Sequence, residues 1–343
     1  MSTINHQTLG NEVKATPYVA GNGFPLFIEP VSERLRGSLA ATQEWLASIP
    51  FEEILAEAGV AVLRGFPVRS TDDFMFVARH IPQIEMGYAG GNAPREVVKG
   101  SVMESTRADA SVLLYLHQEM AYLPQFPTRL AFYCQVPSTT GGETIIADMR
   151  ELQRRIPRDM FEKVRDKGLR YVRNFRSPAR PTGDALLDDF HNTWESAFKT
   201  RDKAVVNAKC EERGVKYEWQ ADDSITMITD LPGVRKHPVT GEQIWMNQMH
   251  TMAMRPPVIS QKMFDAMEAL YNNSDMTRPY SVRFGDDSSI AIDDLASVYK
   301  AYDELTVGFL WQQGDVMFID NYRAAHGRNP FTGKRDIQVQ LFA

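Results

Sequence analysis

The sequence is organised around one run of eight residues, Tyr115-Leu116-His117-Gln118-Glu119-Met120-Ala121-Tyr122. The residues from Val112 to Leu116 are β-branched, aromatic or leucine, a composition typical of a strand. Because alternate side chains of a strand point to the same face, His117 and Glu119 should lie side by side. An imidazole beside a carboxylate is half of a metal site, so at least one further ligand must come from elsewhere in the chain.

The third ligand is predicted near the C-terminus. There the segment from Gly314 to Asn321 has the pattern of a turn and a buried strand, and the chain continues to His326 in the run Ala324-Ala325-His326-Gly327-Arg328. Two imidazoles and one carboxylate, with other coordination positions open, suit a non-haem Fe(II) that also binds a cosubstrate and dioxygen. His250 is a rival third ligand.

Further motifs accompany these ligands in a fixed order. An apolar strand from Leu130 to Cys134 precedes Gly141-Gly142-Glu143-Thr144, Asp148 follows, and Phe331-Thr332-Gly333-Lys334-Arg335 comes after His326. This ordered set resembles the Fe(II)/2-oxoglutarate-dependent dioxygenases of the taurine dioxygenase (TauD/TfdA) superfamily. It is most similar to the branch of clavaminate synthase-like and SyrP-like amino-acid hydroxylases, and the resemblance runs from about residue 65 to the end.

The resemblance implies a role for several of these residues. The three ligands would hold Fe(II), and 2-oxoglutarate and dioxygen would be the cosubstrates. Arg335, nine residues after His326, would bind the distal carboxylate of 2-oxoglutarate, because a guanidinium can form a bidentate contact with it. Thr144 would share that carboxylate, although without Arg335 an ordinary strand threonine would be the simpler interpretation. Lys334 and Arg328 remain alternative anchors.

The implied reaction is hydroxylation of an unactivated C–H bond, with release of succinate and CO2. A glutamate at position 119 favours hydroxylation over halogenation, since related halogenases replace the acid with a small residue. Desaturation, epoxidation and cyclisation use the same chemistry and stay open. The implied substrate is a small molecule, an amino acid that is free or presented on a carrier protein. Candidate substrate-binding residues, each of which could equally be structural, are Glu104, Tyr122, Asn247, Asp287, Asn321 and Arg323.

The fold expected is α+β with a mainly β core: a double-stranded β-helix, or jelly roll, with flanking helices. Residues 1–343 should form a single domain. Within it, residues 1–30 are expected to be an extended arm with one strand near Pro25 to Ile28, and residues 174–247 a lid insertion. A glycine-rich loop from Gly87 to Gly100 is expected at the rim of the cleft.

Composition excludes several other classes of protein. A net charge of -6 without a basic tract argues against nucleic-acid or anionic-membrane partners. Two cysteines are too few for a disulfide scaffold, and no leader or bilayer-length apolar run is apparent, so a cytoplasmic location is expected.

Two other classes of protein fit the sequence less well. The His-x-Glu-x-x-His pattern of helical zinc peptidases is absent, and a zinc hydrolase would leave Thr144 and Arg335 without a role. A non-catalytic jelly-roll binding protein would not need all three ligands. The oligomeric state is not predicted.

Overall fold

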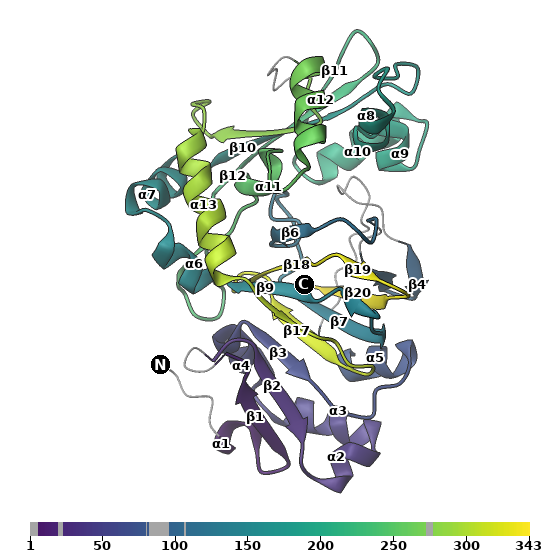
Figure 1. The fold of residues 1–343 in the computed structure, drawn as a ribbon, viewed down its shortest axis with the longest axis vertical. Helices are drawn as coiled ribbons and strands as arrows, with labels where there is room; N and C mark the ends of the chain where they lie inside the picture. Colours follow the sequence, from purple (N-terminus) through teal and green to yellow (C-terminus); the bar gives the residue numbers. More distant parts are fainter. Residues whose placement is uncertain (1–5, 20–22, 80, 82–95, 106–107, 272–276) are drawn as a thin grey trace.

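The computed structural model of this chain describes residues 6–19, 23–79, 81, 96–105, 108–271 and 277–343. The predicted rim loop lies mostly outside these residues, since only its last part, 96–100, is described. The described residues form five sheets, and the three larger ones succeed one another along the long axis of Figure 1. No helix among the described residues is both long and apolar enough to cross a membrane.

A large sheet of eight strands forms the lower half of the molecule in Figure 1. Its strands, in spatial order, are β1 (Val13–Pro17), β2 (Leu26–Pro30), β3 (Val60–Leu63), β17 (Val316–Asp320), β7 (Arg129–Val136), β20 (Asp336–Phe342), β5 (Val102–Glu104) and β4 (Val97–Lys99). Strands from both ends of the chain are therefore neighbours in the same sheet.

A small sheet of four strands lies above the large one in Figure 1. Its strands, in spatial order, are β16 (Val307–Phe309), β9 (Thr144–Asp148), β18 (Ala324–Arg328) and β6 (Leu114–His117). A two-stranded ribbon of β8 (Thr140–Gly141) and β19 (Phe331–Thr332) extends the turns before β9 and after β18.

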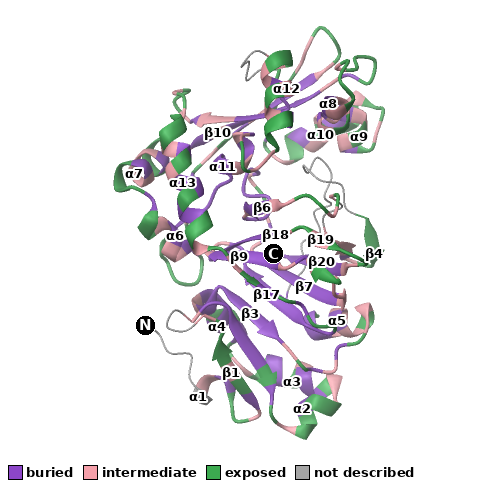
Figure 2. Ribbon diagram, viewed as in Figure 1, coloured by how far each residue is buried: buried purple, intermediate pink, exposed green. Residues whose placement is uncertain are grey.

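The core follows from the period-two alternation of the large sheet. On β7, Leu130 and Phe132 belong to the cluster that also contains Ile146 of the small sheet. The intervening Ala131 and Tyr133 point the other way, into a second cluster formed with the N-terminal helices. Both faces are thus buried, as Figure 2 shows for β7 and β17, and this explains why the middle of β7, Leu130 to Cys134, and most of β17, Val316 to Ile319, are apolar.

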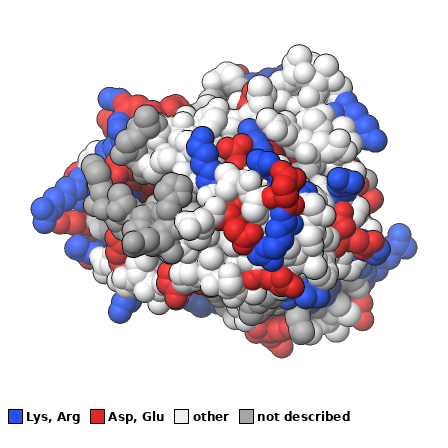
Figure 3. Space-filling model, turned by 90° about the horizontal axis from the view of Figure 1, so that it is seen from below, with Lys and Arg blue, Asp and Glu red and all other residues white. Residues whose placement is uncertain are grey.

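Helices cover the outer face of the large sheet. The N-terminal helices are α1 (His6–Leu9), α2 (Glu33–Gly37), α3 (Leu39–Ser48), α4 (Phe51–Ala58) and α5 (Thr71–Ala78). Helix α4 ends at a glycine cap, because Gly59 has φ 73° and its N–H donates to the Leu55 carbonyl. Seen from below in Figure 3, basic and acidic side chains are interspersed, and Arg34 pairs with Glu12 and Glu44.

The expectation of an extended N-terminal arm is wrong for the described residues. The predicted strand is present as β2, but β1 pairs with it in an antiparallel hairpin, and β2 pairs in parallel with β3. The hairpin therefore extends the large sheet. It is further fixed by the Trp45 indole, which donates to the Leu9 carbonyl at 2.9 Å.

Residues 174–247 form more than a flap over a cleft. They contribute β11 (Lys216–Trp219) and β12 (Ile225–Leu231) to an upper sheet with β10 (Leu169–Phe175) and β15 (Tyr280–Phe284). Two helices of this segment, α9 (Trp194–Phe198) and α10 (Lys203–Glu212), pack a separate apolar cluster that contains Trp194, Phe198 and Cys210. The remaining elements are α8 (Ala185–Phe190), β13 (Val234–Lys236), β14 (Gln243–Trp245), α6 (Met149–Arg155), α7 (Arg158–Lys167), α11 (Met249–Met252), α12 (Gln261–Tyr271) and α13 (Ile292–Leu305).

Candidate metal centre and active-site pocket

Three potential metal ligands meet at one end of the small sheet. His117 ends β6, Glu119 follows it by two residues, and His326 lies on β18 directly opposite His117. One ligand atom from each side chain lies within 4.8 Å of the others, about twice a metal–ligand bond of roughly 2.1 Å. The His326 Nε2 is 3.6 Å from a Glu119 carboxylate oxygen. The geometry and the donor set therefore fit a single divalent transition-metal ion.

A backbone contact fixes the orientation of the His117 ring. Its Nδ1 lies 2.9 Å from the Tyr115 carbonyl oxygen, which can only accept a hydrogen bond. Nδ1 must therefore carry the proton, and the Nε2 lone pair is left for a metal.

Asn321 holds the backbone of Glu119. The Glu119 N–H donates to its Oδ1 at 2.8 Å, and its Nδ2 donates to the Glu119 and Pro127 carbonyls at 2.9 and 2.7 Å. The Asn321 side chain is fully buried by these contacts. This placement argues against the predicted substrate contact and gives Asn321 a positioning role for the ligand.

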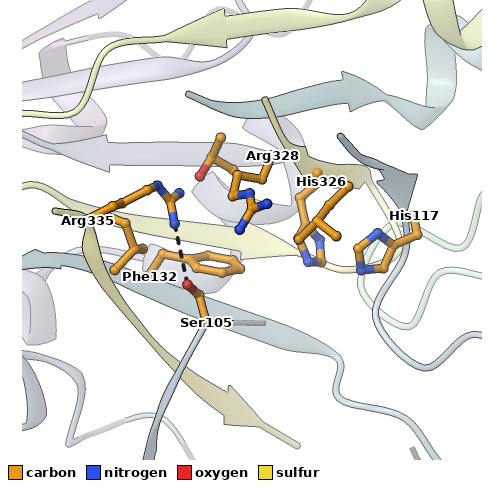
Figure 4. A pocket seen from close by; sticks show the side chains of 10 residues that line it. Ser105, His117, Phe132, His326, Arg328 and Arg335 are labelled. Carbon is orange, nitrogen blue, oxygen red and sulfur yellow. Dashed lines mark hydrogen bonds between the residues drawn. The ribbon is translucent and has the colours of Figure 1, made fainter. Parts of the chain in front are cut away.

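A pocket opens beside the two histidines on the inner side of the small sheet (Figure 4). Its lining residues are Ser105, Leu114, His117, Phe132, Thr144, His326, Gly327, Arg328, Arg335 and Ile337. The pocket therefore joins two of the three candidate metal ligands, His117 and His326, to the two residues predicted to bind a carboxylate. Ser105 and Phe132 were not predicted from the sequence.

Arg335 brings a half-buried cation to the pocket. Its Nε donates to the Gly142 carbonyl at 3.1 Å and its Nη1 to the Ser105 hydroxyl at 3.4 Å. Burial, and secondly the positive charge of Arg328, lower the pKa of Arg335 to about 10. No carboxylate in the described part of the chain forms an ion pair with it. An anionic ligand would offset this desolvated charge.

Thr144 is prepared as a hydrogen-bond donor by Trp311. The indole Nε1–H donates to the Thr144 hydroxyl oxygen at 3.1 Å, and both side chains are buried. Since an indole N–H cannot accept, the threonine O–H remains to donate to another group. The sequence gives only a weak signal for Trp311: a tryptophan that becomes buried needs a hydrogen-bond acceptor for its indole N–H.

The structure also separates the alternative candidates. Lys334 is exposed and does not line the pocket, whereas Arg328 does. His250 is fully buried behind β6, where its Nε2 contacts the Leu116 carbonyl at 2.7 Å and its ring stacks on Tyr302. Burial lowers the pKa of His250 to about 3. His250 therefore supports the ligand strand and does not belong to the three-residue cluster.

Two more of the predicted substrate residues are held inside the protein. The Arg323 guanidinium donates to Asp148 and to the carbonyls of Ala56 and Glu57, so it joins α4 to the small sheet. The side-chain amide of Asn247 donates to the Gly233 carbonyl and accepts from the Met249 N–H. These contacts argue against a substrate-binding role for either residue.

The other three candidates have different surroundings. Asp287 is exposed in the turn after β15 and pairs with Arg170, which gives no support to a substrate role. Tyr122 is buried, with its ring 5.0 Å from the guanidinium carbon of Arg173. Glu104 is half-buried at the end of β5, opposite Gln338. Tyr122 and Glu104 remain candidates.

Comparison with known proteins assigns the family. Residues 32–340 match the family described as taurine catabolism dioxygenase TauD, TfdA family. The chain is 28% identical over 304 residues to the dapdiamide synthesis protein DdaC of Enterobacter agglomerans, covering 88% of this chain and 87% of that protein. It is 29% identical over 300 residues to a clavaminate synthase-like protein of Arabidopsis thaliana, covering 84% and 83%.

Solved structures share the fold at low sequence identity. PvcB of Pseudomonas aeruginosa superposes with a TM-score of 0.55 and 15% identity, over 96% of this chain and 91% of that one. AAD-2, solved with Mn(II) and N-oxalylglycine, gives a TM-score of 0.51 and 11% identity, over 96% and 97%. The chain therefore belongs to the taurine catabolism dioxygenase TauD/TfdA family, and it is an Fe(II)- and 2-oxoglutarate-dependent dioxygenase.

Proposed function

We propose that this enzyme hydroxylates an unactivated C–H bond of an amino acid, either free or bound to a carrier protein as an aminoacyl group. The observation that carries the proposal is the convergence of His117, Glu119 and His326 beside a pocket that contains Arg335 and Thr144. The zinc-hydrolase and non-catalytic alternatives are set aside, because the chain belongs to a dioxygenase family.

Each of these residues has a distinct task in the proposal. Two neutral imidazoles and one carboxylate would hold Fe(II), which, when bound with 2-oxoglutarate and dioxygen, supplies the oxidising power and yields succinate and CO2. Arg335 and Thr144 would bind the distal carboxylate of 2-oxoglutarate and so orient its other end toward the metal ligands. Phe132 and Ile337 line the same pocket and would limit the access of water to it.

In this proposal the chemistry takes place between the large and the small sheet. We infer that the large and small sheets together form the double-stranded β-helix of the family, with residues 1–343 as one domain. Residues 174–247 would cover the entrance from the upper sheet. They are large enough either to enclose a small substrate or to contact a carrier protein.

The similarity to known proteins supports the proposed substrate class, whereas the charged candidate residues do not. Glu104, Asp287 and Arg323 are the charged residues among the predicted substrate candidates, but Arg323 is hydrogen-bonded within the core and Asp287 pairs with Arg170. One relative acts in dapdiamide synthesis, and another is described as clavaminate synthase-like. These names support an amino-acid-derived substrate.

A coupled turnover screen tests the substrate class. The Fe(II)-loaded protein would be supplied with oxygen, 2-oxoglutarate and single L-amino acids or their carrier thioesters, and succinate release would be followed. We expect stimulation by one or a few of them and a product that is heavier by one oxygen. A product lighter by two hydrogens would instead identify desaturation or ring closure. Stimulation by sulfonates, aryloxy acids or other amine-free compounds alone would overturn the substrate assignment.

A further inference from the structure

Arg328 occupies the same pocket as the predicted carboxylate-binding residues. It lies on β18 two residues after His326, and its register partner on β9 is Thr144. Opposed residues of an antiparallel pair project from the same face, so these side chains are neighbours. In Figure 4 the Arg328 side chain lies between those of His326 and Arg335, and the residue is only 6% exposed.

The hydrogen bonds of Arg328 leave one buried donor without a partner. Its Nη1 donates to the Ala108 carbonyl at 3.2 Å, and its Nη2 donates to the Asp109 and Val112 carbonyls at 2.7 and 2.9 Å. The buried Nε has no hydrogen-bond acceptor among the described residues. A buried donor of a charged group is costly when unpaired, so a ligand that accepts from it would be stabilised.

Two guanidinium groups surround one aromatic ring at this site. The guanidinium carbons of Arg328 and Arg335 lie 5.0 and 5.6 Å from the centroid of Phe331. The positive charge of Arg328 is one cause of the lowered pKa of Arg335, so the two cations repel each other, and the folded chain keeps both. Such a pair is suited to an anion that contacts both cations.

We propose that Arg328 is a second arginine of the cosubstrate site, whose Nε–H donates to the distal carboxylate bound by Arg335 and Thr144. The inference rests on the proposed assignment of this pocket to 2-oxoglutarate. Arg328 thus has two roles. It holds the segment 108–112 that leads into β6, and it binds the distal carboxylate of 2-oxoglutarate.

Ligands with and without the distal carboxylate test this role. Dissociation constants for 2-oxoglutarate and for pyruvate, which has a 2-oxo acid but no distal carboxylate, would be measured by calorimetry on Mn(II)-loaded protein. Arg328→Gln should weaken 2-oxoglutarate binding by about tenfold or more, as expected for a hydrogen bond to a charged group, and change pyruvate binding by less than about twofold. The ratio of the two constants is the readout, because a disturbed 108–112 segment would weaken both ligands alike.

An equal loss for both ligands, or no loss for either, overturns the inference. If Arg328→Gln does not fold, the same comparison applies to Arg328→Lys, for which a selective loss of 2-oxoglutarate supports the proposal and an equal loss contradicts it. Failure of the wild-type protein to bind 2-oxoglutarate would instead refute the proposed function itself.

Discussion

Replacing Arg335 with alanine removes a half-buried guanidinium from the pocket without changing the strands that carry the proposed metal ligands. The structure holds this cation in place through the Gly142 carbonyl, so little ordering is left to occur when a carboxylate binds. A charge-assisted hydrogen bond contributes about 1.5 to 3 kcal/mol, and each 1.4 kcal/mol is about tenfold in affinity. Arg335→Ala should therefore raise the Kd for 2-oxoglutarate by roughly ten- to hundredfold.

The assay is a calorimetric titration of Mn(II)-loaded protein with 2-oxoglutarate, accompanied by thermal unfolding of each variant. Thr144→Ala should raise the Kd only about fivefold, because a neutral hydrogen bond contributes about 1 kcal/mol. Lys334→Ala is the matched control, since Lys334 is the exposed neighbour of Arg335 and should leave the Kd within about twofold. If Lys334→Ala weakens binding more than Arg335→Ala does, the anchor has been wrongly assigned.

Three further predictions follow from the surrounding contacts. Trp311→Phe removes the donor to Thr144 and should raise the Kd for 2-oxoglutarate about fivefold, but have little effect once Thr144 is alanine; additive losses would contradict the contact. Asn321→Ala removes three buried hydrogen bonds and should lower the free energy of unfolding in urea by about 3 kcal/mol and weaken metal binding; unchanged metal affinity would show that the Glu119 backbone needs no such support. Burial lowers the pKa of His191 from 6.5 to about 4, so the unfolded state binds the proton first as the pH falls. The free energy of unfolding should therefore decline by up to roughly 1.4 kcal/mol per pH unit between pH 6.5 and pH 4. If the free energy of unfolding of His191→Asn depends on pH in the same way, His191 is not the origin of this decline.

Periodic segments could be predicted from the sequence because their signals are local. The helical period from Arg158 to Lys167 predicts the helix that is present as α7, and the glycine after Ala58 predicts the end of α4. His117 and Glu119 could be found as candidate ligands from their spacing, but strand geometry does not bring them together. Strand β6 ends at His117, and Glu119 lies in the turn after it, where Asn321 holds its backbone. The meeting of both residues with His326 depends on the register between β6 and β18, which no local pattern determines.

Contacts between distant segments account for most of the differences. Three prolines near the N-terminus indicated irregular backbone, yet the parallel pairing of β2 with β3 incorporates the segment into the large sheet. Arg323 and Arg335 are equivalent as residue types near the predicted site. Their surroundings differ. The Arg323 guanidinium donates hydrogen bonds to an aspartate and two backbone carbonyls, whereas Arg335 lines the pocket. Sequence near a site therefore does not distinguish a side chain that faces the ligand from one that supports the scaffold.

Anaerobic titration with Fe(II) and then 2-oxoglutarate tests most directly whether His117, Glu119 and His326 form the metal centre. The wild-type protein should develop a weak visible charge-transfer band when both are present, and no band with Zn(II). His326→Ala should lose the band while still unfolding cooperatively, because one of the three ligands is gone. A band of wild-type intensity in folded His326→Ala would contradict the assignment.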